Sequence, residues 1–158
     1  MAGCTEPSVP RGRRLGVDVG KVRVGVAVSD PDGILATPLV TVPRDTGGAA
    51  DSVPADIAEL VRLVGEHEVV QIVVGLPVRL NGAEGAAAID IRAYSERLAR
   101  AVGQVPIALA DERMSTGVAT RRLAERGVRG KRQRAVVDQA AAVEILQSWL
   151  DAQRRQTR

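Results

Sequence analysis

The chain has 158 residues, enough for a single domain, and its core must be aliphatic because it contains no Phe, one Trp and one Tyr. Its net charge of +3 allows a polyanionic partner without requiring one. Cys4 is the only cysteine, which excludes an internal disulfide and a cysteine-based zinc cluster. No run of about 18 apolar residues is present, so we predict no transmembrane helix and a cytoplasmic location.

The first predicted elements are two paired strands. Residues 1–13 are rich in Pro, Gly and polar side chains, which predicts a disordered leader. Strands are predicted at Leu15–Val19 and Val22–Val28, and the second alternates valine with Arg, Gly or Ala. Because only Gly20 and Lys21 separate them, the two strands are expected to form an antiparallel hairpin.

The later strands and the helices follow from apolar runs and spacing. Ile34–Val42 is predicted as an edge strand, because Pro38 has no N–H to donate to a sheet ladder. Val69–Leu76 is a continuous apolar run, typical of a strand covered on both faces, and Pro106–Ala110 is predicted as a second one. Apolar residues at helical spacing predict helices at 51–66, 84–102, 115–126 and 135–153.

The order of these elements predicts one domain at 14–153, followed by a flexible basic tail at 154–158. Strand, helix and strand in succession form parallel pairs with right-handed crossovers. In sheets of this kind, ligands bind and react at the carboxyl ends of the parallel strands. Acidic residues near those ends are therefore the candidates for function.

Two acids stand where apolar residues are expected. Asp18 interrupts the apolar run of the first strand, so it lies either at the solvent end or beside a compensating cation. The alternative is a turn aspartate bound to the backbone around Gly20. Asp138 is predicted in the first turn of the last helix, where an acid favours the helix dipole. It nevertheless heads the apolar stripe through Ile145 and Trp149, a position that is more often functional than decorative.

Asp111 and Glu112 follow the strand predicted at 106–110 directly, and Arg113 comes next. One alternative is that Asp111 or Ser115 caps the following helix. Acids from separate segments that meet at one end of a sheet persist only with bound cations or raised pKa values. Oxygen ligands suit Mg²⁺ or Mn²⁺, and two such ions can clamp the attacking and leaving oxygens of a phosphodiester. The acids therefore predict a metal-dependent nuclease.

A basic segment precedes Asp138. Seven Lys or Arg residues and one acid lie between Arg121 and Arg134. Such runs are usually solvated surface, but this one adjoins the expected acid site, where a phosphate backbone needs neutralising. With few aromatic residues for stacking, contacts to phosphates are expected to dominate. The residues expected to make them from a loop are Arg129, Lys131, Arg132 and Arg134.

Four segments of the chain resemble the YqgF family, known as pre-16S rRNA nucleases or Holliday junction resolvase-like proteins. The segments are G-V-D-V-G-K-V-R-V-G-V-A-V-S-D (16–30), V-V-G-L-P (73–77) with Asn81-Gly82, D-E-R-M-S-T (111–116) and V-D-Q-A-A-A-V-E-I-L (137–146). Each is weak alone. Together, in order over nearly all of residues 14–150, they make the resemblance specific.

The resemblance implies an α/β fold of the ribonuclease H-like type. Its five-stranded mixed sheet would have the first three strands antiparallel and helices on both faces. The resemblance further implies that Asp18, Glu112 and Asp138 are catalytic and bind Mg²⁺ or Mn²⁺, with Asp111 as a further candidate ligand.

The resemblance also implies a substrate side to the site. Gly75, Pro77 and Asn81 would shape the loop beside the acids, and Arg113 would lie close to the substrate phosphate. The complete set of candidate substrate-binding residues is Lys21, Arg23, Asn81, Arg113, Arg129, Lys131, Arg132 and Arg134.

The expected function is metal-dependent hydrolysis that processes the 5′ end of pre-16S rRNA in ribosome biogenesis, on free RNA or on the ribosomal precursor particle. The alternatives are a Holliday junction resolvase and a non-catalytic nucleic-acid-binding module. Sugar-kinase or actin-type ATPases also open with a D-x-G turn, but they need two such domains. A resolvase is expected to dimerise. No dimer surface is evident in the sequence, so a monomer or weak homodimer acting on RNA is predicted.

Overall fold

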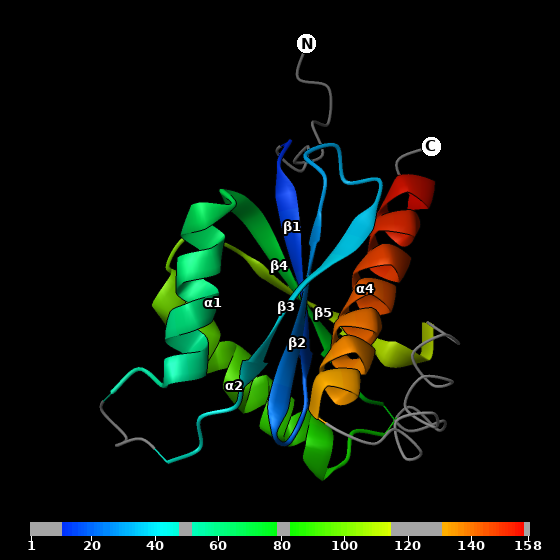
Figure 1. Cartoon of the computed structure of the whole chain (residues 1–158). Helices are drawn as coiled ribbons and strands as arrows, with labels where there is room; N and C mark the ends of the chain where they lie inside the picture. Colours follow the sequence, from blue (N-terminus) through cyan, green and yellow to red (C-terminus); the bar gives the residue numbers. More distant parts are fainter. Residues whose placement is uncertain (1–10, 48–51, 79–82, 115–130, 157–158) are drawn as a thin grey trace.

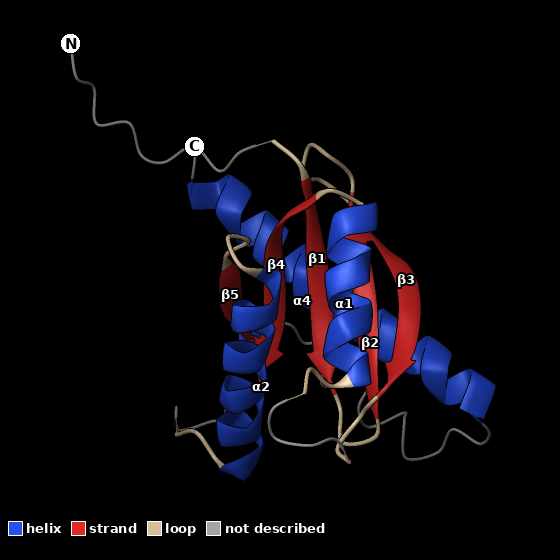
Figure 2. Ribbon diagram, turned by 90° about the vertical axis from the view of Figure 1, so that its left-hand side faces the viewer, coloured by secondary structure: helices blue, strands red, loops and turns tan. Residues whose placement is uncertain are grey.

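In a computed structural model, the chain forms a five-stranded mixed sheet between two helical layers (Figures 1 and 2). The structure describes residues 11–47, 52–78, 83–114 and 131–156, with the backbone alone at 114 and 131–136. The strands are β1 (Arg13–Val19), β2 (Arg23–Ser29), β3 (Ala36–Pro43), β4 (Val69–Leu76) and β5 (Ile107–Asp111). The described helices are α1 (Ala55–Glu66), α2 (Ala86–Val102) and α4 (Lys131–Gln156), with a 3₁₀ turn η1 (Glu112–Met114).

The strand order β3-β2-β1-β4-β5 confirms the predicted sheet. β1 pairs with β2, and β2 with β3, in antiparallel register, whereas β4 pairs in parallel with both β1 and β5. Antiparallel neighbours can be joined by short turns, but the parallel pair β4–β5 needs the crossover that α2 supplies. Pro38 lies in β3, which is an edge strand as predicted.

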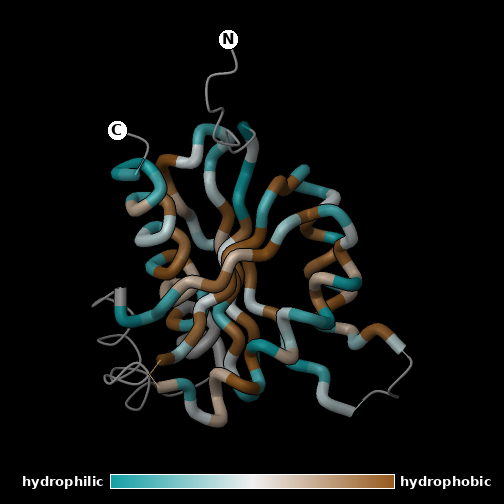
Figure 3. Tube along the Cα trace, turned by 180° about the vertical axis from the view of Figure 1, so that it is seen from behind, coloured by the Kyte–Doolittle hydropathy of each residue, from teal (hydrophilic) through white to brown (hydrophobic). Residues whose placement is uncertain are grey.

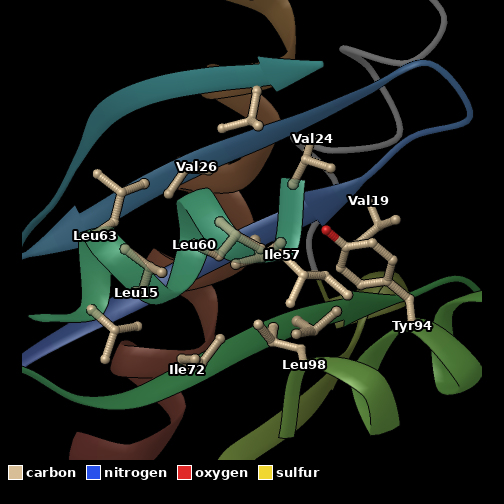
Figure 4. Close-up of a cluster of buried hydrophobic side chains, with 14 of the residues drawn as sticks. Leu15, Val19, Val24, Val26, Ile57, Leu60, Leu63, Ile72, Tyr94 and Leu98 are labelled. Carbon is tan, nitrogen blue, oxygen red and sulfur yellow. The ribbon is translucent and has the colours of Figure 1, made fainter. Parts of the chain in front are cut away.

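Side-chain alternation along the strands fills two separate cores. Leu15, Val17 and Val19 of β1 belong to the core under α1 and α2 (Figure 4). The second core, under α4, is smaller and contains Ala142 and Leu146. In Figure 3 the central strands are mostly brown, the colour of apolar residues, because both of their faces are covered. Burying one such Val or Leu side chain is worth about 1.5–3 kcal/mol.

Glycines let α4 lie directly on the strand backbones. A Cβ added at Gly16 would lie 2.6 Å from the Cβ of Leu146, and one at Gly75 would lie 2.5 Å from Cδ1 of Ile145. Real Cβ atoms essentially never approach so closely, so a larger residue at Gly16 would push the helix away, whereas one at Gly75 would displace the end of the Ile145 side chain. The close packing fixes the height of α4 above the sheet.

The start of α4 differs from the prediction. The helix begins at Lys131 rather than at Ala135, so Lys131, Arg132 and Arg134 lie in its first turn and not in a loop. Lys, Arg and Gln are good helix formers, which favours this extension. Asp138 is consequently the eighth residue of the helix rather than a first-turn residue. The helix-dipole interpretation of Asp138 is therefore wrong.

Strands β2 and β3 also begin later than predicted. Val22 is 66% exposed in the turn before β2, and β3 begins at Ala36 rather than at Ile34. The Asp30 carboxylate explains the second difference, because it accepts hydrogen bonds from the amides of Ile34 and Leu35, both at 2.8 Å. These two residues belong to a side-chain-stabilised turn.

Burial of β5 was overestimated. β5 is the edge strand beyond β4, and Ala110 is its one fully buried residue. An edge strand has a neighbour on one side only, so a short apolar run alone does not show that a strand is central. The helix predicted at 115–126 lies outside the described residues. None of the described helices is both long and apolar enough to cross a membrane.

Candidate active site

Three acids are brought to one edge of the sheet, at the carboxyl ends of β1, β4 and β5. Asp18 is the penultimate residue of β1, Glu112 follows β5 directly, and Asp138 lies in α4. The parallel registers align β1 with β4 and β4 with β5, so the three strands end at the same level. The edge at which chemistry was predicted is thus the edge at which these acids lie.

Asp18 and Asp138 approach one another across Gly25. Gly25 of β2 is the register partner of Asp18, and a Cβ added to it would collide with the main-chain carbonyl of Asp138. Both acids are buried, with 7% of Asp18 and 8% of Asp138 exposed. The absence of a side chain at Gly25 therefore allows a helix acid to lie over the strand that pairs with Asp18.

Glu112 enters the same region over Gly75. A Cβ added to Gly75 would lie 3.0 Å from Oε1 of Glu112. Glu112 is half-buried, since it lies in the 3₁₀ turn at the rim of the sheet. Gly75 therefore leaves room for Glu112 beside the buried pair, as well as for α4.

Arg23 is the ion-pair partner of Asp138. Its Nε donates to Oδ2 of Asp138 at 2.7 Å, and the two side chains are only 21% and 11% exposed. A charge-assisted hydrogen bond of this length is among the stronger kinds in proteins. Arg23 was predicted to bind substrate, and the structure shows that it also neutralises one of the three acids.

Asp111 is engaged by Arg113. The guanidinium of Arg113 donates to both carboxylate oxygens of Asp111, from Nε to Oδ1 at 3.2 Å and from Nη2 to Oδ2 at 2.7 Å. The backbone N–H of Arg113 also donates to Oδ1 at 2.9 Å. These bonds lower the pKa of Asp111 below its ordinary value, the side-chain bond being the largest cause. A metal ion would have to compete with Arg113 for this carboxylate.

The other predicted substrate residues lie in the β1–β2 turn, directly after β4, at the start of α4, or outside the described residues. Lys21 is exposed in the β1–β2 turn, and Pro77 directly follows β4. Lys131, Arg132 and Arg134 lie in the first turn of α4. Asn81 and Arg129 are outside the described residues.

Sequence reasoning missed a polar cluster on the other face of the sheet. The Tyr94 hydroxyl donates to Oδ2 of Asp56 at 3.1 Å, and Asp56 is only 1% exposed. The Arg44 guanidinium lies 5.0 Å from the centre of the Tyr94 ring. A signal was available, because Asp56 stands on the apolar stripe of α1 beside Ile57 and Leu60.

The three acids fit a divalent metal by chemistry more clearly than by spacing. All of their donors are carboxylate oxygens, the ligands that Mg²⁺ and Mn²⁺ prefer. Gly25 and Gly75 provide a cradle that a Cβ would fill. Among the described residues, however, no three ligating side chains already stand close enough together to hold an ion. Asp138 instead faces Arg23.

Comparisons with known proteins agree with these features. The family model described as "RuvX: Holliday junction resolvase" matches residues 12–152. A relative in Nocardia farcinica, named "Putative pre-16S rRNA nuclease", is 54% identical over 93% of this chain and 81% of its own length. One of the same name in Mycobacterium ulcerans is also 54% identical, over 94% of this chain and 84% of its own length.

A solved structure with a similar fold is "T. thermophilus RuvC in complex with Holliday junction substrate". Its TM-score is 0.62 over 92% of this chain and 97% of that chain, with 16% sequence identity. At that identity the likeness concerns the fold alone. It confirms the predicted ribonuclease H-like architecture.

Proposed function

This chain belongs to the RuvX family of Holliday junction resolvases, and from that premise we propose that it cleaves pre-16S rRNA with Asp18, Glu112 and Asp138 as its catalytic acids. Membership makes it a nuclease, a hydrolase of phosphodiester bonds. Beyond this activity, we propose which residues are catalytic, which metal ion they bind and which RNA is the substrate.

One observation carries the assignment of the acids. Asp18, Glu112 and Asp138 come from three separate elements, yet two glycines bring them to one edge of the sheet. Burying acids near one another is costly unless cations compensate them. Arg23 compensates Asp138 in this structure, and a fold has little reason to gather further acids there for stability alone.

The three carboxylates would hold Mg²⁺ or Mn²⁺. When bound, such an ion activates water and neutralises the charge that develops on a phosphodiester. Arg23 holds the Asp138 carboxylate oriented toward β2, because its Nε donates to Oδ2. Arg113, 40% exposed, would meet a substrate phosphate with the part of its guanidinium that faces away from Asp111.

The substrate proposed is the 5′ region of pre-16S rRNA. The proposal rests on the name shared by the relatives that are 52–54% identical over more than nine-tenths of this chain. Lys21, and the basic residues that begin α4, would contact backbone phosphates rather than bases. Asn81 and Arg129, which lie outside the described residues, are proposed to join them.

A Holliday junction is the second candidate substrate. The description of the family itself favours it. A resolvase must present two active sites to a two-fold symmetric junction, so this reading requires a dimer.

The test compares two labelled substrates, a precursor rRNA 5′ segment and a four-way DNA junction. Each is incubated with purified protein and Mn²⁺ or Mg²⁺, or with EDTA. We expect metal-dependent RNA cleavage that falls at least about 100-fold in Asp18→Asn, because an amide is a poorer and neutral ligand. The variant keeps the side-chain volume, and circular dichroism checks that it folds.

The outcomes separate the candidates. RNA cleavage that survives in Asp18→Asn would remove Asp18 from the site. Paired symmetric nicks in the junction without RNA cleavage would replace the rRNA proposal by resolution. Binding of either substrate without cleavage, in every metal, would support a binding module instead.

A further inference from the structure

The turn between β1 and β2 is held by one arginine. Arg44 follows β3, and its backbone N–H donates to the carbonyl of Val22 at 2.8 Å. Its Nη1 donates to the carbonyl of Gly20 at 2.9 Å. The N–H of Gly20 in turn donates to the carbonyl of Arg23 at 2.8 Å. These three bonds define the path of the chain from β1 into β2.

The guanidinium of Arg44 is itself fixed from α2. Nη1 and Nη2 donate to the two carboxylate oxygens of Asp90, at 3.1 and 3.2 Å. The guanidinium also lies 5.0 Å from the centre of the Tyr94 ring, and the Arg44 side chain is only 8% exposed. A planar fork that binds a carboxylate and stacks on a ring has few alternative positions, and lysine cannot reproduce it.

Tyr94 is anchored in turn by α1. Its hydroxyl donates to the buried carboxylate of Asp56, and Figure 4 shows its ring in the core with Val19. Burial, and then the nearby Asp56, raise the pKa of Tyr94 above its ordinary value. The hydroxyl therefore stays protonated and keeps donating at any physiological pH. Arg44 is thus held by two residues of α2, and one of these is anchored on α1.

The turn leads directly to the acid site on the other face of the sheet. Asp18 lies two residues before Gly20, and Arg23, at the end of the turn, donates to Asp138. A shift of the turn would move Arg23 relative to α4 and so disturb the ion pair. The Arg44 cluster and the acid site are therefore joined through the three turn residues Gly20, Lys21 and Val22.

We propose that Arg44 is a positioning residue of the acid site, which sets the β1–β2 turn and thereby holds Arg23 against Asp138. Its catalytic consequence rests on the proposed nuclease function, but its structural consequence does not. Misplacement by about 1 Å at a reacting centre can cost on the order of 100-fold in rate. A residue that never touches substrate can therefore have a large effect.

The first measurement is spectroscopic and needs no substrate. The Nε–H correlation of Arg23 in a ¹H–¹⁵N spectrum reports its bond to Asp138, and Arg23→Lys identifies the peak by removing it. We expect the peak to move or vanish in Arg44→Gln and in Arg44→Lys. The matched control is Arg92→Gln, which breaks the ion pair with Glu84 on the surface of α2 and leaves the peak in place.

The second measurement is cleavage of the substrate that the wild-type protein cuts. We expect Arg44→Gln to lower kcat about 10- to 100-fold with KM changed less than about threefold, because the reacting groups move while the phosphate contacts proposed for the start of α4 remain. Arg44→Lys is expected not to restore kcat, and Arg92→Gln is expected to match wild type. A loss of kcat explained by unfolding is recognised by circular dichroism.

The two measurements distinguish this proposal from the function on which it rests. An Arg23 peak that stays in place in both folded Arg44 variants overturns the positioning role, whatever the activity. A peak that moves in a protein that cleaves neither RNA nor junction supports the positioning role and counts against the nuclease proposal. A peak that moves together with an unchanged kcat overturns the catalytic consequence.

Discussion

Asp138 lies on the inward face of α4, and its side chain is 11% exposed. A carboxylate taken out of water costs several kcal/mol unless an opposite charge compensates it. Arg23 provides that charge at 2.7 Å, from a position 115 residues earlier in the sequence. The pair therefore ties the first hairpin to the last helix at the acid site.

The substitution Arg23→Gln removes the charged partner of Asp138. We expect the variant to lose about 1–3 kcal/mol of stability without metal, because a buried carboxylate loses its charged partner. Mn²⁺ should then raise the melting temperature more in the variant than in wild type, since a cation replaces the missing charge. Thermal unfolding in EDTA and in Mn²⁺ measures both effects.

The control for this variant is Arg62→Gln. Arg62 pairs with Glu59 and Glu66 on the exposed side of α1. Exposed pairs contribute little, so neither the melting temperature nor its response to metal should change much. Equal behaviour of the two variants would mean that Arg23 and Asp138 form an ordinary surface pair with no link to metal.

The contact of α4 with the sheet depends on glycines that the helix backbone covers. Gly25 lies under Asp138, so Gly25→Ala should displace the helix at the acid site. Overpacking of this kind typically costs about 1–3 kcal/mol. The matched control is Gly65→Ala in α1, where an added Cβ meets no atom within 4 Å. That substitution should be neutral or stabilising by up to about 1 kcal/mol.

Urea unfolding of the two alanine variants measures the difference. A Gly25→Ala protein as stable as wild type would show that α4 can move away from the sheet without loss. In that case the Asp18–Gly25–Asp138 contact would not hold the acids together.

The start of α1 is stabilised by an acid from outside the helix. Asp45 accepts hydrogen bonds from the N–H of Ala55 at 2.8 Å and of Gly47 at 3.2 Å, while Pro54 supplies no side-chain cap. These backbone bonds lower the pKa of Asp45, that from Ala55 most. A depressed pKa stabilises the fold above the ordinary aspartate value, and this contribution is lost as pH falls through the depressed value.

Asp45→Ala should therefore be less stable than wild type at pH 6 and should lose less stability on acidification. The expected measurement is urea unfolding at pH 6, 4 and 3, with amide exchange at Ala55 to report on the cap. If the free energy of unfolding falls with pH equally in the two proteins, Asp45 is not the source of this pH dependence.

Across the whole molecule, α4 lies on one side of the sheet and the helices α1 and α2 on the other (Figure 1). The acids and the basic start of α4 are on the α4 side. Such a division suits a protein that binds a polyanion on one face. Binding should then depend on salt through the charges of that face, because each phosphate contact releases counterions.

Replacing Arg129, Lys131, Arg132 and Arg134 by Gln should weaken RNA binding and reduce the slope of log affinity against log salt by up to about 3. Arg97→Gln with Arg100→Gln, on the exposed surface of α2, is the control for general charge loss and should leave the slope nearly unchanged. If the slope of log affinity against log salt falls by the same amount per removed charge in both variants, RNA binding does not favour the α4 side.

The sequence by itself determined the succession of strands along the chain and the edge position of β3. It also determined which acids follow or interrupt those strands. These features follow from local patterns. The apolar run Val69–Leu76 forms a strand with those bounds, and Pro38 lies at a sheet edge because it lacks an N–H. Glu112 lies at the rim because it follows a parallel strand. Element ends were less predictable, since α4 begins at Lys131 although the apolar spacing that predicted the helix starts only at Ala135.

Only the tertiary structure decided which charged residues are partners. Arg23 bonds Asp138 and Arg44 bonds the β1–β2 turn because strand register and helix height bring distant residues together. Asp56 shows the limit of a sequence pattern. Like Asp138 it is an acid on an inward helical stripe, yet it lies in the opposite core and accepts the hydroxyl of Tyr94. A periodicity shows that an acid faces inward, but the partner that it meets there depends on the packing of the whole chain.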